Sequence, residues 1–170
     1  ISPGDTRIFD KMVLLGLGVP DPSLVNDLSK PRSSGDERGA EILRRMLKPF
    51  CWAVKTVYFD RRQSYHIDCV MSVLDEGLLA CKKDALWTDL PDEIKDWEML
   101  EISPEDQKLG IANNVPLGNK RLVCHAGSKK FAKDMEKRGW ELFEVPYSTV
   151  YGRIGSGVHC STASLWREFD

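Results

Sequence analysis

The sequence contains no long apolar run and no surplus of charge of either sign. No stretch approaches the roughly 20 apolar residues that a helix needs to cross a bilayer, and the first residues lack the basic and then apolar pattern of a signal peptide. Lys and Arg number 24 against 26 Asp and Glu, for a net charge of -2, so there is no basic excess to neutralise a phosphate backbone. We therefore expect no nucleic-acid or membrane partner and a cytoplasmic location.

The composition is that of a folded globular protein. The chain has 170 residues, of which 42% are hydrophobic and 29% are charged, and this length predicts a single compact domain over residues 1–170. The chain begins at Ile1 rather than Met, so we expect further residues before it. Targeting and oligomeric state stay open at this stage.

The five cysteines do not form a C-x-x-C pair, so we expect free thiols and neither a metal site nor a redox couple. Four of them lie in apolar runs, which predicts small buried hydrophobic residues; these are Cys51, Cys69, Cys81 and Cys124. Cys160 differs from them, because it lies in the glycine-flanked polar stretch Gly155–Thr162, which is typical of an exposed turn.

The same series of elements, a hairpin, a helix and a strand, recurs about every fifty residues. The first series is predicted over Thr6–Phe9, Met12–Leu17, a helix at Asp36–Leu47 and a strand at Cys51–Phe59. The second is predicted over His66–Val73, Leu78–Cys81, a short helix at Pro91–Trp97 and a strand at Met99–Ile102. The third is predicted over Ile111–Leu117, Arg121–Ala126, a helix at Ser128–Arg138 and a strand at Trp140–Val145, and a last strand is expected at Ser161–Trp166.

This order predicts an α/β fold of about three and a half ββαβ units. Such units do not bury their sheet and helix faces alone, and an arrangement around a common axis is one way to cover them. A plain α+β sandwich is the alternative that periodicity leaves open.

His66 and Asp68 are the first candidates for chemistry. Residues i and i+2 of a strand project to the same side, so on the strand predicted at His66–Val73 both side chains would enter one space. Together with Cys160 they form a set suited to nucleophilic catalysis, in which a thiolate attacks, an imidazole moves protons and a carboxylate orients a cation. A structural histidine is the alternative for His66. A papain-like site is another, although the order of His before Cys is not that of papain.

Three motifs and their order along the chain resemble those of the guanidino-group-modifying enzymes, which include arginine deiminases, dihydrolases and amidinotransferases. The motifs are Gly157–Thr162 (GVHCST), His66–Asp68 (HID) and Pro3–Thr6 (PGDT). The resemblance covers nearly the whole chain. It implies a pentein-type propeller of five ββαβ units around a substrate pocket, here incomplete at the N-terminus, a small guanidino compound as substrate, and no metal or other cofactor.

The resemblance also implies roles for individual residues. Cys160 takes the place of the nucleophile that attacks the guanidinium carbon, and His66 that of the general acid and base. Asp68 and Asp5 take the places of carboxylates that bind guanidinium nitrogens, for which charge-assisted hydrogen bonds are well suited. A turn-forming role beside Gly4 is the alternative for Asp5.

The resemblance implies two further substrate-binding residues. Arg32 resembles the arginine that pairs with a substrate carboxylate, with an exposed loop arginine as the alternative, and Asn114 resembles a pocket-lining asparagine. The chain also departs from the family pattern. Pro3 stands where a glycine is common, and Arg62 stands four residues before His66, where a carboxylate is expected.

The ending Ala163–Glu168 is closer to the hydrolases than to the arginine-rich ending of the amidinotransferases, so the sequence favours a hydrolase. An amidinotransferase is the alternative reaction. Two other classes stay open: a non-catalytic propeller that serves as a binding ring, and a thiol protease or acyltransferase, for which the sequence offers no oxyanion hole or peptide groove.

Overall fold

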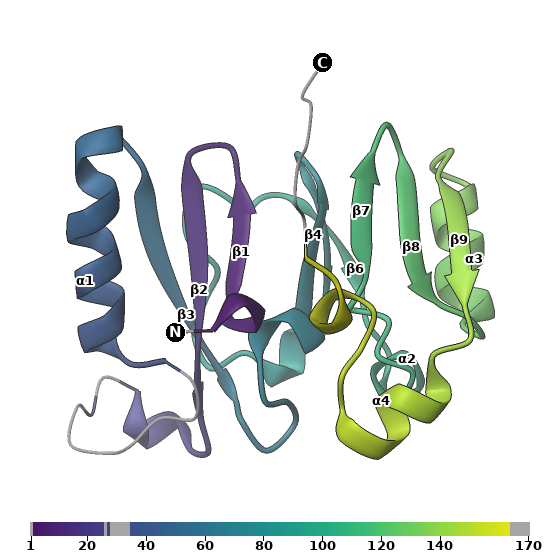
Figure 1. Cartoon of the computed structure of the whole chain (residues 1–170), viewed down its shortest axis with the longest axis horizontal. Helices are drawn as coiled ribbons and strands as arrows, with labels where there is room; N and C mark the ends of the chain where they lie inside the picture. The colour runs from purple at the N-terminus through teal and green to yellow at the C-terminus, as the bar shows by residue number, and fades with distance from the viewer. Residues whose placement is uncertain (1, 26, 28–34, 164–170) are drawn as a thin grey trace.

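Three similar small sheets follow one another in the computed structural model, which describes residues 2–25, 27 and 35–163. In each sheet the middle strand is antiparallel to the first strand and parallel to the third. Figure 1 shows the sheets side by side, with α1 at one end of the row and α3 at the other. The predicted α/β repeat is thus confirmed as a mixed fold of three units.

The first unit comprises β1 (Thr6–Phe9), β2 (Met12–Val19), α1 (Glu37–Leu47) and β3 (Ala53–Asp60). Every residue of β2 is buried, because this strand lies between two partners and is covered on both faces. Helix α1 begins where Asp36 accepts a hydrogen bond from the backbone N–H of Gly39 at 2.7 Å, as an N-cap aspartate does.

The second unit comprises β4 (Met71–Asp75), β5 (Leu78–Cys81) and β6 (Glu98–Glu101). The helix predicted at Pro91–Trp97 is wrong, because this segment forms only turns. Its N–H groups at Ile94 and Lys95 both bond to the carbonyl of Pro91, at 2.9 Å each. A segment of this length gains too few backbone bonds to offset helix nucleation, and packing of the buried Ile94 holds the turn instead.

The third unit comprises β7 (Val115–Gly118), β8 (Arg121–His125), α3 (Lys129–Glu136) and β9 (Glu141–Val145). The hairpin turns at Gly118 and Asn119, which have φ angles of 80° and 49°. Ser128 accepts a hydrogen bond from the N–H of Phe131 at 3.1 Å and so caps α3. These turn and cap residues are the ones that the sequence predicts.

Short elements connect the units. They are η1 (Pro3–Asp5), η2 (Pro22–Leu24), η3 (Lys48–Phe50), η4 (Ile67–Cys69), η5 (Lys83–Ala85), α2 (Pro104–Lys108), α4 (Ser148–Ile154) and η6 (His159–Ser161). The strand predicted at His66–Val73 is wrong in its first half, because η4 precedes β4. The strand predicted at Ser161–Trp166 is wrong over residues 161–163, where Ser161 ends η6 and the next two residues are irregular. The rest of that segment lies outside the described residues.

Four of the connecting segments meet near the middle of the molecule, and we call them the junction turns: η1, η4, residues 111–114 and η6. The first three lead into β1, β4 and β7. The chain returns from β9 through α4 to bring η6 beside η1 (Figure 1). There the N–H of His159 donates to the carbonyl of Asn113 at 3.1 Å, so η6 is joined to the turn that precedes β7.

Apolar clusters join neighbouring units. One contains Leu14 and Phe59 of the first unit with Met71 and Leu79 of the second. Another joins Leu74 and Ile102 of the second unit to Leu122, Phe131 and Trp140 of the third. These clusters fix the angle between successive sheets and thereby place the junction turns. In the part of the chain that the structure describes, no helix is long and apolar enough to cross a membrane.

All five cysteines are free, as predicted. Burial is as predicted for Cys69, Cys81 and Cys124, but the prediction is wrong for Cys51, which is exposed. Cys51 follows η3 with a φ of 59°. In this left-handed conformation it ends the helical turn at the surface, and its neighbour Trp52 packs against the core instead.

Candidate active site

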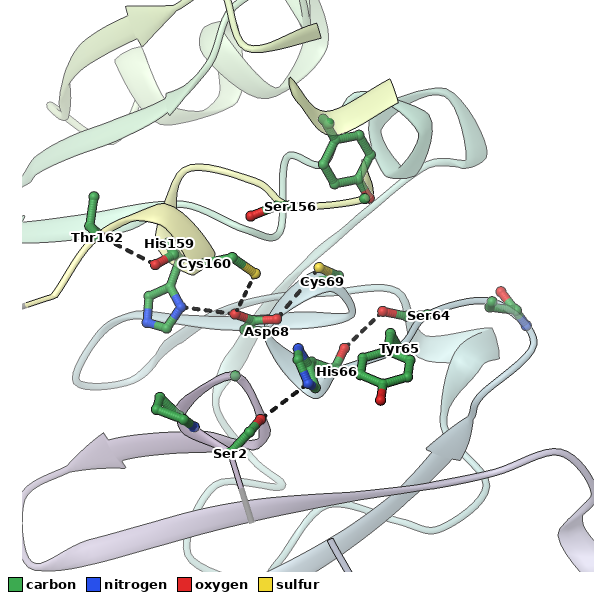
Figure 2. A pocket seen from close by; sticks show the side chains of 15 residues that line it. Ser2, Ser64, Tyr65, His66, Asp68, Cys69, Ser156, His159, Cys160 and Thr162 are labelled. Carbon is green, nitrogen blue, oxygen red and sulfur yellow. Dashed lines mark hydrogen bonds and ion pairs between the residues drawn. The ribbon is translucent and has the colours of Figure 1, made fainter. Parts of the chain in front are cut away.

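Three of the junction turns, η1, η4 and η6, border a pocket of about 610 Å³. Ser2 and Gly4 border it from η1, His66 and Asp68 from η4, and Cys160 from η6. Because each group comes from a different unit of the fold, the pocket depends on how the sheets are placed relative to one another. In Figure 2 the side chains of His159, Cys160 and Cys69 point toward the carboxylate of Asp68, and the ring of His66 points toward Ser2.

Asp68 lies at the centre and is fully buried. Its Oδ2 accepts hydrogen bonds from His159 Nδ1 at 2.9 Å and from Cys160 Sγ at 3.1 Å. Burial alone would raise the pKa of Asp68, but the hydrogen bond from His159 and the positive charge of Arg7 outweigh it and lower that pKa. Asp68 is therefore a buried carboxylate that stays ionised, as the binding of a planar cation requires.

Arg7 of β1 supports this carboxylate from behind. Its guanidinium donates to the backbone carbonyls of Met71 and Asp68, at 3.0 and 3.1 Å, and to His159 Nε2 at 2.8 Å. A guanidinium only donates, so His159 Nε2 accepts and its Nδ1–H donates to Asp68. Both ring nitrogens of His159 are engaged, and this imidazole orients the carboxylate.

His66 approaches the pocket from the opposite side. Its Nε2 lies 3.1 Å from Ser2 Oγ, and its ring packs edge-on against Tyr65 with the ring centroids 4.6 Å apart. Its Nδ1 lies over Gly4, where a Cβ would stand only 2.6 Å away. A glycine is thus required beside this imidazole, which the motif at Pro3–Thr6 supplies.

A ring nitrogen of His66, a carboxylate oxygen of Asp68 and Sγ of Cys160 all lie within 4.8 Å of one another. The carboxylate of Asp68 already accepts hydrogen bonds from His159 and Cys160, and its Oδ1 lies 3.5 Å from Cys69 Sγ. A carboxylate in such a network can orient a polar group beside a thiol.

Cys160 and Cys69 are neighbouring thiols with opposite properties. Cys160 is exposed and Cys69 is buried. The pKa of Cys160 is lowered, because a hydrogen bond from Cys69 favours its thiolate more than burial and the charge of Asp68 oppose it. The pKa of Cys69 is strongly raised by that hydrogen bond and by burial. Cys160 is therefore the thiol that ionises and reaches the pocket.

The structure brings together His66, Asp68 and Cys160, the three residues that the sequence predicts to be catalytic. The structure brings His66 and Asp68 together through a helical turn and not through the predicted strand. His66 precedes η4 in an extended conformation and Asp68 lies within the turn. The turn forms because Ile67 must enter the core, where it is fully buried, and it leaves both polar side chains at the pocket.

The predicted substrate-binding residues do not line this pocket in the described part of the chain. Asp5 is fully buried and accepts hydrogen bonds from the N–H and Oγ of Ser2 at 3.2 and 3.1 Å. Asn114 is also buried and bonds to Ser72 Oγ at 2.7 Å and to the carbonyl of Ile111 at 2.9 Å. Arg32 lies outside the described residues. Arg62, which stands in place of a carboxylate, pairs with Asp60 at 2.8 Å.

Four residues at the site are missed by the sequence interpretation: Arg7, Cys69, Asn113 and His159. Three of them are direct neighbours of predicted residues, since Cys69 follows Asp68, His159 precedes Cys160 and Asn113 precedes Asn114. Adjacency to a motif is thus the signal that could have found them. Arg7 also directly follows a motif, Pro3–Thr6, but its burial could not be predicted, because a buried arginine on a strand cannot be distinguished by pattern from a surface one.

Comparison with known proteins gives a clear result for the fold. No family model matches the chain. Among curated proteins, YkgA of Bacillus subtilis, named as uncharacterized, is 27% identical over 104 residues, which cover 60% of this chain and 36% of that protein.

Several solved structures share the architecture. The DDAH of Pseudomonas aeruginosa, in complex with citrulline, has a TM-score of 0.68 at 18% identity and matches 91% of this chain and 52% of its own. The amidinotransferase SxtG of Microseira wollei has a TM-score of 0.73 at 16% identity, and the match covers 98% of this chain and 48% of SxtG. The N-terminal domain of ArgZ, a cyanobacterial arginine dihydrolase bound to product, has a TM-score of 0.70 at 17% identity and matches 92% and 53%.

The chain thus spans about half the length of the solved structures that it matches. All three of these neighbours are guanidino-modifying enzymes of the pentein superfamily. The resemblance that the motifs predict is borne out at the level of architecture: this chain has the pentein fold of the guanidino-modifying enzymes.

Proposed function

We propose that the protein is a thiol-dependent enzyme that acts on the guanidinium carbon of arginine or a related guanidino compound. The observation that carries the proposal is the convergence of Cys160, Asp68 and His66 on one pocket, within 4.8 Å of one another. The shared fold with DDAH, SxtG and ArgZ supports it. A non-catalytic binding ring would have no need for an ionisable thiol beside an ionised buried carboxylate.

Each group has a role that its chemistry suits. Asp68 binds the guanidinium through charge-assisted hydrogen bonds. The thiol of Cys160, which donates to this carboxylate in the unliganded site, passes its proton to His66. Cys160 then attacks the guanidinium carbon and forms a carbon–sulfur bond. His66 delivers a proton to the departing nitrogen as the carbon–nitrogen bond breaks.

Water resolves the covalent amidino-cysteine intermediate in this proposal. His66, which has lost its proton to the amine, takes one from water as the oxygen adds to the carbon. The carbon–sulfur bond then breaks, His66 returns its proton to the sulfur, and a ureido product leaves with Cys160 free again. An acceptor amine in place of water would yield a new guanidine, which is the amidinotransferase alternative.

Product analysis tests the proposal. The full protein is incubated with arginine, agmatine and methylated arginines, with and without glycine or lysine, and citrulline, ammonia, ornithine and new guanidino compounds are assayed. We expect a ureido product and amine or ammonia without any acceptor. Ornithine formed only with an acceptor, with no citrulline or ammonia, would instead support the transferase.

Active-site labelling provides a second readout. A haloacetamidine resembles a guanidinium and should alkylate Cys160 ahead of Cys51, the other exposed thiol. Equal labelling of these two thiols, together with no turnover of any guanidine, would refute the proposed function.

A further inference from the structure

Asn113 lies behind the pocket at the place where residues 111–114 meet η6, and it is fully buried. Its amide oxygen accepts the backbone N–H of Cys160 at 3.0 Å. A backbone N–H donates and never accepts, so this bond assigns the orientation of the amide. The NH₂ group of Asn113 therefore faces away from the backbone of Cys160 and toward sulfur.

Two sulfur atoms stand in front of that NH₂ group. Asn113 Nδ2 lies 3.1 Å from Cys160 Sγ and 3.3 Å from Cys69 Sγ. A neutral thiol sulfur accepts hydrogen bonds weakly, whereas a thiolate accepts them strongly. A buried amide directed at two sulfurs is thus best satisfied when one of them is an anion.

Of the two sulfurs, Cys160 is the one that becomes the anion. The pKa of Cys69 is raised strongly by its hydrogen bond with Cys160 and by burial, whereas the pKa of Cys160 is lowered by the same bond. Cys69 consequently stays a neutral thiol in contact with the amide.

The fit between Asn113 and the loop that carries Cys160 is close. A Cβ at Gly157 would stand 2.4 Å from the amide oxygen of Asn113, so only glycine permits this approach. The backbone carbonyl of Asn113 also accepts the N–H of His159 at 3.1 Å. One buried residue therefore holds the backbone of η6 at two successive positions and its nucleophilic sulfur at a third point.

We propose that Asn113 is a positioning residue that anchors the backbone of Cys160 and donates an amide hydrogen to its sulfur, so that the thiolate form of this side chain is stabilised facing the pocket. The inference extends the proposed function, because it takes Cys160 as the nucleophile. Asn113 acts through Cys160 and does not itself contact the substrate.

Other groups around Cys160 also affect its ionisation. The carboxylate of Asp68 disfavours the thiolate, and the buried guanidinium of Arg7 favours it. Tyr151 of α4 has its pKa raised to about 12, chiefly by burial, and stays neutral near pH 7. The imidazole of His66 lies beside Cys160 from the η4 turn, and His159 precedes Cys160 on η6 itself. None of these groups changes in a variant at Asn113, so a comparison with the unaltered protein isolates the amide.

The test measures the acidity of each thiol without any guanidine. The full protein is treated with iodoacetamide from pH 5 to pH 10, and alkylation of each cysteine is followed by peptide mass spectrometry. We expect Cys160 to react with a midpoint below that of Cys51, its exposed reference. In Asn113→Ala the midpoint of Cys160 should rise by about one pH unit, which is roughly a tenfold loss of thiolate at pH 7.

Two further variants make the result decisive. Asn113→Asp keeps the acceptor for the N–H of Cys160 but removes the amide donor, so the alkylation midpoint of Cys160 should rise at least as far as in Asn113→Ala. This variant provides the test if Asn113→Ala does not fold. Asn119→Asp makes the same change at an exposed turn position and should leave the midpoint unaltered. A merely structural role for Asn113 would lower the Tm of its variants without moving the midpoint.

An unchanged midpoint in a folded Asn113→Ala or Asn113→Asp variant, or a wild-type midpoint for Cys160 no lower than that of Cys51, overturns the inference. Because alkylation needs no substrate, these outcomes are independent of the proposed function. The expected thiol shifts together with no turnover of any guanidine would leave the inference standing and refute the function.

Discussion

The sheets and the junction turns of this protein are held together in different ways. The sheets rely on backbone ladders and on buried apolar residues, such as Leu14 and Phe59 on one side and Leu122 and Trp140 on the other. The junction turns rely on side-chain hydrogen bonds that cross from one unit to another, as from Arg7 to His159. The sheets therefore determine where the turns lie, and the turns supply the chemistry.

The cysteines show how much this difference matters. Cys81 on β5 and Cys124 on β8 are buried within their sheets, and burial raises the pKa of each thiol to about 12. Cys160 on η6 has the opposite shift, which a hydrogen bond from Cys69 causes. The same side chain is a small apolar residue in one region and an acidic thiol in the other.

The largest effect that we predict is that of removing the thiol from η6. Cys160→Ala should reduce guanidine turnover by roughly a thousandfold or more, because no other group forms the covalent intermediate. The Tm should stay nearly the same, since the side chain is exposed. Steady-state kinetics and thermal melts check this, with Cys51→Ala, the other exposed thiol, as the control that leaves both unchanged. Full activity in Cys160→Ala would remove the nucleophile assignment.

A change within a sheet should have the opposite signature. Leu122→Ala on β8 removes a fully buried side chain from the cluster between the second and third units. It should lower the free energy of unfolding by about 2 to 5 kcal/mol, or the Tm by roughly 5 to 15 °C. Well below that Tm, the alkylation rate of Cys160 should be unaltered.

The control for this sheet variant is Leu117→Ala on β7, where the side chain is 45% exposed. Its stability should change by no more than about 0.5 kcal/mol. If Leu122→Ala slowed alkylation of Cys160 at low temperature, the sheets would be influencing the chemistry directly and the division between the two regions would fail.

The difference between the sheets and the junction turns also explains which features the sequence predicts well. Strand and helix positions follow from apolar periodicity, and the hairpin turn at Gly118 and the cap at Ser128 follow from local backbone chemistry. These features depend on neighbours in sequence. The helix expected at Pro91–Trp97 fails because its pattern is too short to decide between a helix and a packed turn, and the contact that decides it is the burial of Ile94 in a core shared with another unit.

The site is predictable only as far as its motifs extend. Cys160, His66 and Asp68 are found because their residue types and order are distinctive. The contacts of Asn113 with both thiols join positions that are 44 and 47 residues apart, and no local pattern encodes such a pairing. Likewise Arg7 reaches His159 across 152 residues. These contacts exist only once the sheets have placed the turns together.

A third prediction concerns the carboxylate at the centre of the junction turns. Asp68→Asn keeps the shape of the side chain but removes its charge, so the guanidinium loses a charged hydrogen bond worth about 1.5 to 3 kcal/mol. The value of kcat/KM should fall by about 10- to 150-fold or more, since His159 and Cys160 also lose the charged oxygen to which both donate. Asp5→Asn, measured beside it, tests the role that the sequence resemblance implies, and normal kinetics there would limit Asp5 to holding Ser2.

The smallest effect that we predict is in the pH dependence of stability. The folded protein holds the pKa of Asp68 below its ordinary value of about 3.9, so ionised Asp68 stabilises the fold at neutral pH. That contribution is complete above the unfolded pKa and is lost as the pH falls through the folded one. In urea unfolding, the stability difference between the unaltered protein and Asp68→Asn should stay constant from pH 7 to about pH 5 and shrink below about pH 4.

Asp60→Asn is the matched comparison at the end of β3, because the pKa of Asp60 is also lowered, chiefly by its hydrogen bond with Arg62. It should show the same acid-side trend, since linkage depends on the sign of the shift and not on the region, but without the loss of kcat/KM. A difference between unaltered protein and Asp68→Asn that persisted undiminished to pH 3 would mean that the charge of Asp68 contributes nothing to folding, and that Arg7 and His159 are placed by the sheets alone.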